Sequence, residues 1–193
     1  MKPSIVYLHG LNCSPTIFSH LHSQLPEHNP IFIEYDSFQA IEDSYEFVLS
    51  KIEQKKVSVI GHSLGGLIGL LLASRSNNIT VERLATISSP FGGSKAAIGA
   101  RILFPRFKVF KDIDTTSEII NEVSNAKISH HLSIISTGGS LPIMFDDNDS
   151  VVSVSSQKAA QTQLKIEVES NHFEAVQCET TIKEIEKYLF RPI

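Results

Sequence analysis

The pentapeptide GHSLG at residues 61–65 restricts the fold of this 193-residue chain more than any other feature of its sequence. It follows the apolar run 57–60 directly and precedes the helical pattern 67–72. A strand, a tight turn and a helix in this order hold the serine of a GxSxG motif in a strained backbone conformation, which small flanking residues permit. The sequence therefore predicts a nucleophile elbow that presents Ser63 above the carboxyl ends of a sheet.

Two other interpretations of this turn compete with the nucleophile. A glycine-rich turn can simply pack a helix closely on a sheet, and Gly65, Gly66 and Gly69 would serve that purpose. Such a turn at the start of a helix also binds anions such as phosphate. However, no Lys-Ser or Lys-Thr pair follows it as in a P-loop, and GxGxxG is absent. The strand before and the helix after Ser63 favour the nucleophile.

Short apolar runs rich in β-branched residues alternate with longer helical patterns along the chain. This alternation is typical of stacked βαβ units, and nearly continuous hydrophobic runs suit strands that helices cover on both faces. The predicted strands are 4–9, 30–35, 56–60, 81–88, 131–137 and 164–169. Helices are expected at about 37–54, with Ser37 as the cap, and at about 174–189. The sequence predicts one α/β domain over residues 1–193, a three-layer α/β/α sandwich with a mostly parallel sheet of about six strands.

One long connection, at about 91–127, interrupts the alternation. It exceeds the usual length of a crossover with one helix. Its part 97–111 interleaves aliphatic and aromatic side chains with basic ones, which suits a lid that docks on lipid or covers an acyl chain. A helix or turn packed on the core is the alternative that we favour, so contact with a membrane surface through 98–110 is not the favoured expectation. Capping residues at 114–118 predict a further helix start.

Composition excludes several classes of protein. Apolar residues make up 41% of the chain, charged residues 20%, and the net charge is −4 without a Lys/Arg run, so nucleic acid is not an expected partner. Cys13 and Cys178 have no CxxC spacing, which disfavours a disulfide framework and is compatible with a reducing compartment. The apolar run at 5–8 is too short for a signal peptide or a membrane span, so a cytoplasmic protein is expected.

A serine nucleophile requires a histidine base, and in this kind of sheet the base comes later in the chain. Only His130, His131 and His172 follow Ser63. His172 follows the last predicted strand and so lies at the same edge of the sheet as Ser63. The other two precede their strand, at the opposite edge. The sequence therefore predicts that His172 is the base.

The acid that orients the base should follow another strand at the same edge. Asp146, Asp147 and Asp149 all follow the strand 131–137. Asp149 is favoured because it directly precedes the apolar residues 151–152, which could anchor its loop beneath the histidine. The other two aspartates remain alternatives, and so do a solvated acidic loop and a weak Ca²⁺ site.

Backbone N–H groups are expected to stabilise the oxyanion. One belongs to Leu64, at the start of the helix after the serine, and the other to Leu11, in the loop after the first strand. His9 is expected to brace that loop, because it has no partner at a metal-ligand spacing. His20 and His22 are interpreted as surface residues on different sides of a helix.

Together, these motifs resemble the α/β-hydrolase superfamily, and within it the small bacterial lipase and esterase type. The resemblance covers nearly the whole chain: 8–11 is similar to the His-Gly oxyanion loop, 61–65 to the elbow, 87–94 to the TPHxGS-like stretch and 148–152 to the NDGxV acid loop. The last match supports Asp149 independently of spacing, and His172 occupies the histidine position. Two residues depart from these motifs. Phe91 stands where lipases often have His, and Ser150 replaces the Gly that follows the acid. The usual opening antiparallel strands are missing, which implies a reduced sheet.

The resemblance implies a serine hydrolase of carboxylic esters with an apolar acyl group and no cofactor or metal. Ser63 would attack the carbonyl carbon, His172 would transfer its proton to the leaving alcohol, and Asp149 would orient the histidine. The same triad serves thioesterases and amidases, and a non-catalytic binding protein on this scaffold is the alternative from another class.

Overall fold

The structure is a computed structural model that describes residues 2–141 and 146–190. Within them it has one six-stranded sheet with the order β2-β1-β3-β4-β5-β6, in which every neighbouring pair is parallel. The strands are β1 (Ser4–Leu8), β2 (Asn29–Ile33), β3 (Lys56–His62), β4 (Thr80–Ile87), β5 (His131–Ser136) and β6 (Leu164–Val168). This confirms the predicted α/β class and the six parallel strands.

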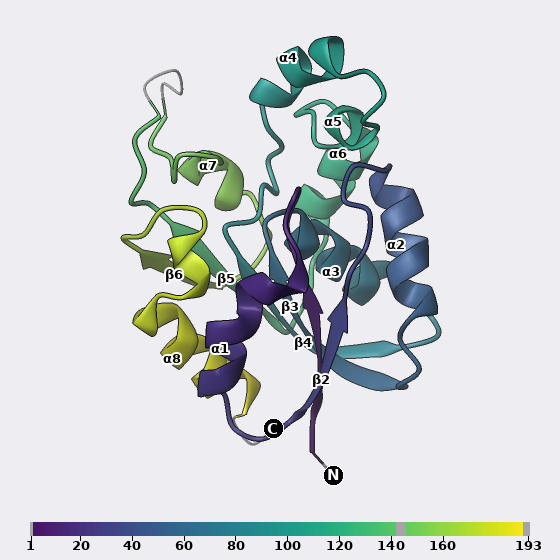
Figure 1. Cartoon of the computed structure of the whole chain (residues 1–193), viewed down its shortest axis with the longest axis vertical. Coiled ribbons are helices and arrows are strands. Elements are labelled where there is room, and N and C mark those ends of the chain that lie inside the picture. The colour runs from purple at the N-terminus through teal and green to yellow at the C-terminus, as the bar shows by residue number, and fades with distance from the viewer. Residues whose placement is uncertain (1, 142–145, 191–193) are drawn as a thin grey trace.

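Helices cover both faces of the sheet (Figure 1). Two helices lie on one face, α1 (Ser19–Gln24), which follows the 3-10 turn η1 (Pro15–Phe18), and α8 (Glu179–Leu189). The opposite face packs against α2 (Ile41–Ser50), α3 (Leu64–Arg75) and α6 (Glu118–Asn125). Alternate side chains of β1 enter the two cores, Val6 and Leu8 on one side and Ile5 and Tyr7 on the other. The molecule is therefore the three-layer sandwich that the sequence predicts.

Two helices begin later than the sequence predicts. Ser37 does not cap α2, because its Oγ accepts a hydrogen bond from the backbone N–H of Asn12 (2.9 Å). The carboxylate of Asp36 accepts from the N–H of Phe38 (3.0 Å), which forms a local turn that competes with a helix. The first helical residue is therefore Ile41. At the other end of the chain, the 3-10 turn η2 (Glu174–Val176) precedes α8.

The long connection between β4 and β5 contains α4 (Ala96–Leu103), α5 (Val109–Asp112) and α6. Two side chains of α6, Ile120 and Val123, are buried in the core, and Ser117 caps this helix by accepting a hydrogen bond from the N–H of Ile120 (3.1 Å). In contrast, α4 lies at the outer end of the molecule, beyond α5 and α6 (Figure 1). The connection thus has an inner part that belongs to the core and an outer part that lies largely in solvent.

Of the two histidines expected on the surface, His20 and His22, only the first is fully exposed. His20 is exposed, whereas His22 is half-buried and its ring meets Tyr7 and Phe32 edge-on. The Nδ1 of His22 lies 3.2 Å from the Nε2 of His28, which also bonds to the hydroxyl of Tyr7 (2.7 Å). Aromatic neighbours from other elements bury His22, and its own helix gives no sign of them.

Burial of His131 predicts that the fold is sensitive to acid. Its ring is buried against Thr86 and Phe91, and burial lowers the pKa of His131 to about 4. Between pH 6.5 and pH 4, the unfolded chain binds a proton at this residue that the native chain does not bind. As the pH falls through this range, we therefore expect this residue to lower the free energy of unfolding by up to about 1.4 kcal/mol per pH unit. Above pH 6.5 the residue should make no contribution to the pH dependence.

Urea denaturation at several pH values measures this slope. The variant His131→Gln should have a flatter pH dependence, and His130→Gln, which changes the exposed neighbour, should retain that of the unaltered protein. Equal slopes in all three proteins would contradict the assignment to His131.

Candidate active site

Ser63 occupies the sharp turn between β3 and α3. Its φ of +53° and ψ of −120° are strained for a residue with a side chain, and its N–H donates to the carbonyl of Ile87 (2.9 Å) in β4. The flanking glycines are required by close packing. A Cβ on Gly65 would lie 2.0 Å from the carbonyl oxygen of Leu8, and one on Gly61 would lie 2.5 Å from that of Gly65. The structure thus has the strand, strained turn and helix that the motif predicts.

His172 and Asp149 form a buried pair on two neighbouring loops, the one after β6 and the one after β5. The Nδ1 of His172 donates a hydrogen bond to Oδ2 of Asp149 (2.8 Å). The backbone joins the same two residues, since the N–H of His172 donates to the carbonyl of Asp149 (3.0 Å). Because the carboxylate can only accept, the proton of the neutral ring is on Nδ1, and Nε2 keeps its lone pair.

Hydrogen bonds keep Asp149 ionised although it is buried. Burial alone would raise the pKa of Asp149, but the bond from His172, together with those from Ser136 (2.5 Å) and the backbone N–H of Val152 (2.7 Å), outweighs burial and lowers it. The side chain of Gln157 adds a donor 3.2 Å from Oδ2. An ionised carboxylate at this position stabilises a positive charge on the histidine.

Sequence reasoning missed Ser136 and Gln157. The amide of Gln157 is bound to the backbone of Ser136 in both directions, through Oε1 to the N–H (2.9 Å) and through Nε2 to the carbonyl (3.0 Å). The hydroxyl of Ser136 lies 2.7 Å from that of Ser88, at the end of β4. Ser136 shares its strand with the polar residues His131 and Ser133, so nothing in the sequence singled it out, and the sequence contains no signal for Gln157 either.

The other two aspartates do not reach the histidine. Asp146 and Asp147 are exposed, and Asp149 alone of the three is buried. The described residues contain no group of three His, Cys, Asp or Glu placed to hold a metal ion. Both oxygens of Asp149 already accept hydrogen bonds from N–H or O–H groups, which leaves a cation no favourable place beside it.

The departures from the lipase motifs have local explanations. Phe91 is fully buried, with its ring edge toward His131, so it belongs to the core. Ser150 adopts a φ of +79°, the left-handed region that glycine adopts without steric cost. The structure thus gives a reason why a glycine is suited to the position after the acid.

The loop after β1 passes close to Ser63. A Cβ on Gly10 would lie 2.9 Å from the Cβ of Ser63, which leaves room at this position for glycine alone. His9 braces the loop as expected: its ring stacks on Tyr35, whose hydroxyl donates to the carbonyl of His9 (2.5 Å). Leu64 is the first residue of α3, where the helix itself offers no acceptor for its N–H.

His62 supports the loop that carries His172. It is fully buried, and its Nε2 donates to the carbonyl oxygen of His172 (3.0 Å). Burial, followed by the neighbouring imidazole of His172, lowers the pKa of His62 to about 3, so this ring stays neutral. Its place beside Ser63 in the motif gave no indication of this role.

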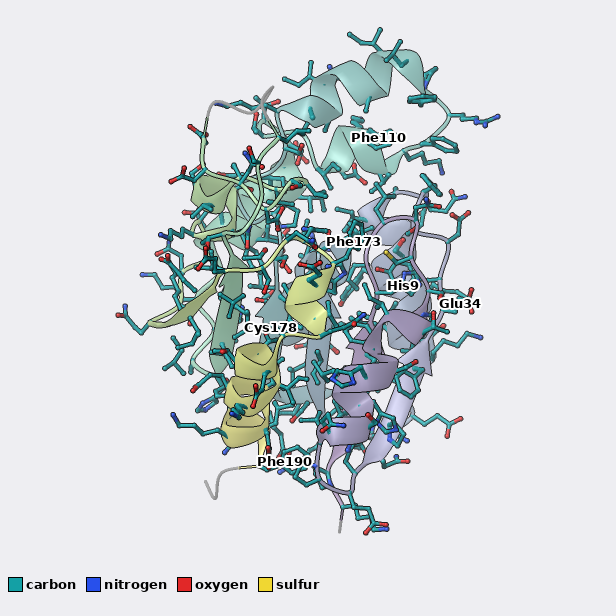
Figure 2. The ribbon with its side chains drawn as sticks, turned by 60° about the vertical axis from the view of Figure 1, so that its left-hand side comes forward. His9, Glu34, Phe110, Phe173, Cys178 and Phe190 are labelled. Carbon is teal, nitrogen blue, oxygen red and sulfur yellow. The ribbon has the colours of Figure 1, made fainter. Side chains whose placement is uncertain are left out.

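A cavity of about 140 Å³ joins these elements. Ser63 and His172 both line it, together with Leu11 and Leu64, the two residues predicted to supply oxyanion N–H groups. Most of the remaining lining is apolar, namely Pro90, Val109, Ile113, Val151, Val152 and Phe173. Figure 2 shows Phe173 and His9 near the middle height of the molecule, below the segment with Phe110. Ser63 and His172, predicted from the sequence as nucleophile and base, therefore line one largely apolar cavity.

A second hollow of about 600 Å³ adjoins the first through Cys13, which lines both. Its other lining residues are mainly polar and include Asn12, Ser14, Asp36 and Ser37. The site thus has a small apolar cavity beside a larger, open hollow of mixed polarity.

Comparison with solved structures finds the same fold in bacterial hydrolases. The mature lipase BlEst2 from Bacillus licheniformis superposes with a TM-score of 0.76 at 18% identity, over 96% of this chain and 91% of that one. A lipase-esterase related protein from Clostridium acetobutylicum gives 0.70 at 16% identity, over 97% and 94% of the two chains. The enol-lactonase from Burkholderia xenovorans gives 0.70 at 15%, over 99% and 92%.

Comparison by sequence identifies a family. Residues 32–191 match the model of the family described as PGAP1-like alpha/beta domain. No curated protein matches the sequence. The family match covers most of the chain, including the turn with Ser63 and the loops that carry Asp149 and His172.

Proposed function

The chain belongs to the family of PGAP1-like alpha/beta domains, within the α/β-hydrolase superfamily, and we propose on this premise that it is a serine hydrolase of carboxylic esters. One observation carries the proposal. The buried pair of Asp149 and His172 fixes the tautomer that keeps Nε2 unprotonated, and that ring lines the same cavity as the strained Ser63. A scaffold that only binds a ligand has no need for such an arrangement.

The chemistry follows the usual order of acyl transfer. Ser63 attacks the carbonyl carbon through Oγ, while Nε2 of His172 accepts its proton and Asp149 stabilises the imidazolium. The N–H groups of Leu11 and Leu64 donate to the oxyanion. When the bond to the alcohol oxygen breaks, Nε2 returns the proton to the leaving group. Water then attacks the acyl-enzyme by the same route and releases the acid.

The cavity and the hollow beside it suggest where the two parts of the ester bind. The apolar lining of the smaller cavity suits the acyl group, and its volume is well below the roughly 300–1,000 Å³ of pockets for drug-sized ligands. It therefore suits a short acyl chain or the first carbons of a longer one. The open hollow beyond Cys13, which polar and apolar side chains line together, suits the alcohol portion.

Labelling with a fluorophosphonate probe tests the nucleophile directly. The phosphorus should be attacked by Ser63, and mass spectrometry of the digested protein should locate the adduct on the peptide that contains residues 61–65. Ser63→Ala should abolish labelling. Ser94→Ala is the matched control, because Ser94 lines the same cavity outside the elbow and its loss should leave labelling intact. Failure of the unaltered protein to react would overturn the proposed function and favour a binding protein.

A further inference from the structure

The outer end of the α4–α5 segment carries an unusually exposed apolar surface. Four large side chains, Ile98, Ile102, Leu103 and Phe104, lie within seven residues, and we call them the α4 face. Ile102 and Leu103 are each 73% exposed, more than any other large apolar residue that the structure describes. Because soluble surfaces rarely collect such side chains without a role, the α4 face marks an interaction surface.

Basic residues surround the α4 face. Residues 95–111 contain five Lys or Arg and no Asp or Glu, although the whole chain has a net charge of −4. All five are exposed. Two form ion pairs, Arg101 with Asp114 (3.3 Å) and Lys108 with Asp43 (3.2 Å). In the described parts of the chain, the other three, at positions 95, 106 and 111, have no ion-pair partner.

The same segment forms part of the wall of the cavity that Ser63 lines. Ser94, Val109 and Ile113 contribute to that wall from either side of α4. Phe173 lines the cavity from the opposite loop and is itself half exposed. The α4 face therefore belongs to a segment whose flanking residues border the cavity, and α4 itself lies at the outer end of the molecule (Figure 1).

We propose that the α4 face and its basic residues dock on an anionic lipid bilayer. Apolar side chains that enter the acyl boundary, with Lys and Arg at the level of the headgroups, are the pattern by which a helix lies on a membrane. The described residues include no helix long and apolar enough to cross one. A second copy of the chain fits the surface less well, since a two-fold contact through it would place the two basic segments against each other.

This docking does not depend on the proposed function, because it rests on exposed side chains outside the triad. If both hold, the esters that reach the cavity come from the membrane or from molecules held at its surface. The catalytically silenced variant Ser63→Ala should therefore bind vesicles as well as the unaltered protein. If the protein binds vesicles but does not react with the fluorophosphonate, only the proposed hydrolase function is wrong. If it reacts with the fluorophosphonate but does not bind vesicles, only the proposed docking is wrong.

Co-sedimentation with vesicles tests the docking. The full chain should bind vesicles of phosphatidylglycerol and phosphatidylcholine in equal parts at least tenfold more tightly than vesicles of pure phosphatidylcholine. The double variant Ile102→Asp/Leu103→Asp should weaken binding to the mixed vesicles by at least tenfold. Both side chains point largely into solvent, so their replacement should leave the fold intact, which circular dichroism checks. Leu164→Asp, at an exposed apolar residue on β6, is the matched control and should bind normally.

The charged part of the surface has its own test. Reversal of Lys95 and Lys111 to Glu should remove the preference for anionic vesicles, since each cation near such a surface strengthens binding by about fivefold. The matched control changes Lys127 and Lys165 to Glu and should keep the preference for anionic vesicles. These two residues are exposed near the amino ends of β5 and β6. Equal binding to both kinds of vesicle would overturn the proposal. Unchanged binding of Ile102→Asp/Leu103→Asp to the mixed vesicles would overturn it too. So would a dimer in analytical ultracentrifugation that Ile102→Asp/Leu103→Asp dissociates, because a second copy would then cover the surface.

Discussion

Asp149→Asn is expected to lower kcat for ester hydrolysis by about 10⁴-fold while the protein remains folded. The amide keeps the size of the side chain but presents an N–H group where the carboxylate accepts from Nδ1 of His172. The ring then favours the tautomer that carries its proton on Nε2. That atom must be unprotonated to accept the proton of Ser63. The loss should appear in kcat rather than in KM, because Asp149 does not line the cavity.

Asp146→Asn and Asp147→Asn are the matched controls for this measurement. Both residues are exposed and neither bonds to His172, so each variant should retain the kcat of the unaltered protein. A large loss in Asp146→Asn with normal turnover in Asp149→Asn would reassign the acid. The fluorophosphonate reaction of Asp149→Asn should also be slow, since it requires the same base.

Gly65→Ala is expected to reduce the free energy of unfolding by about 4 kcal/mol or more, or to prevent folding. The new Cβ would lie 2.0 Å from the carbonyl oxygen and 2.5 Å from the carbonyl carbon of Leu8, and both atoms belong to the backbone of the buried strand β1. No side-chain rotation relieves this overlap. Urea denaturation at neutral pH measures the change, with the yield of soluble protein as the second readout.

The control Gly99→Ala is expected to act in the opposite direction. Gly99 lies inside α4, and a Cβ there has no neighbouring atom within 4 Å. Alanine in a helix interior is favoured over glycine by about 0.5–1 kcal/mol, so this variant should be slightly more stable. A similar loss of stability in both variants would show that the close contact of Gly65 with Leu8 is not the cause.

Local sequence patterns were sufficient for the layers of this fold. Each of the six apolar runs became a strand, because a parallel strand covered on both faces is nearly continuously hydrophobic. Asp149 was distinguished from its two neighbours by the apolar pair that follows it. Of that pair, Val152 is buried and Val151 is exposed, and the backbone N–H of each donates to the carboxylate of Asp149.

The remaining features depend on contacts between distant segments. Gln157 bonds to Ser136 across 21 positions, and His62 to the carbonyl of His172 across 110, so no local pattern announces either. The start of α2 was predicted too early for the same reason. The sequence predicted Ser37 as a helix cap. Its hydroxyl instead accepts a hydrogen bond from the backbone N–H of Asn12, in the loop after β1.

The order of the strands has a consequence for the nascent chain. Ser63 and the loop beside it belong to β1 and β3, whereas the acid and the base follow β5 and β6, which pair in turn onto β4. A ribosome that has completed only the first four strands holds a chain with its serine already in sequence but without the proposed acid and base. Under the proposed mechanism, the growing polypeptide therefore stays inactive toward esters until β6 and the loop with His172 have joined the sheet, and the onset of activity reports that step of folding.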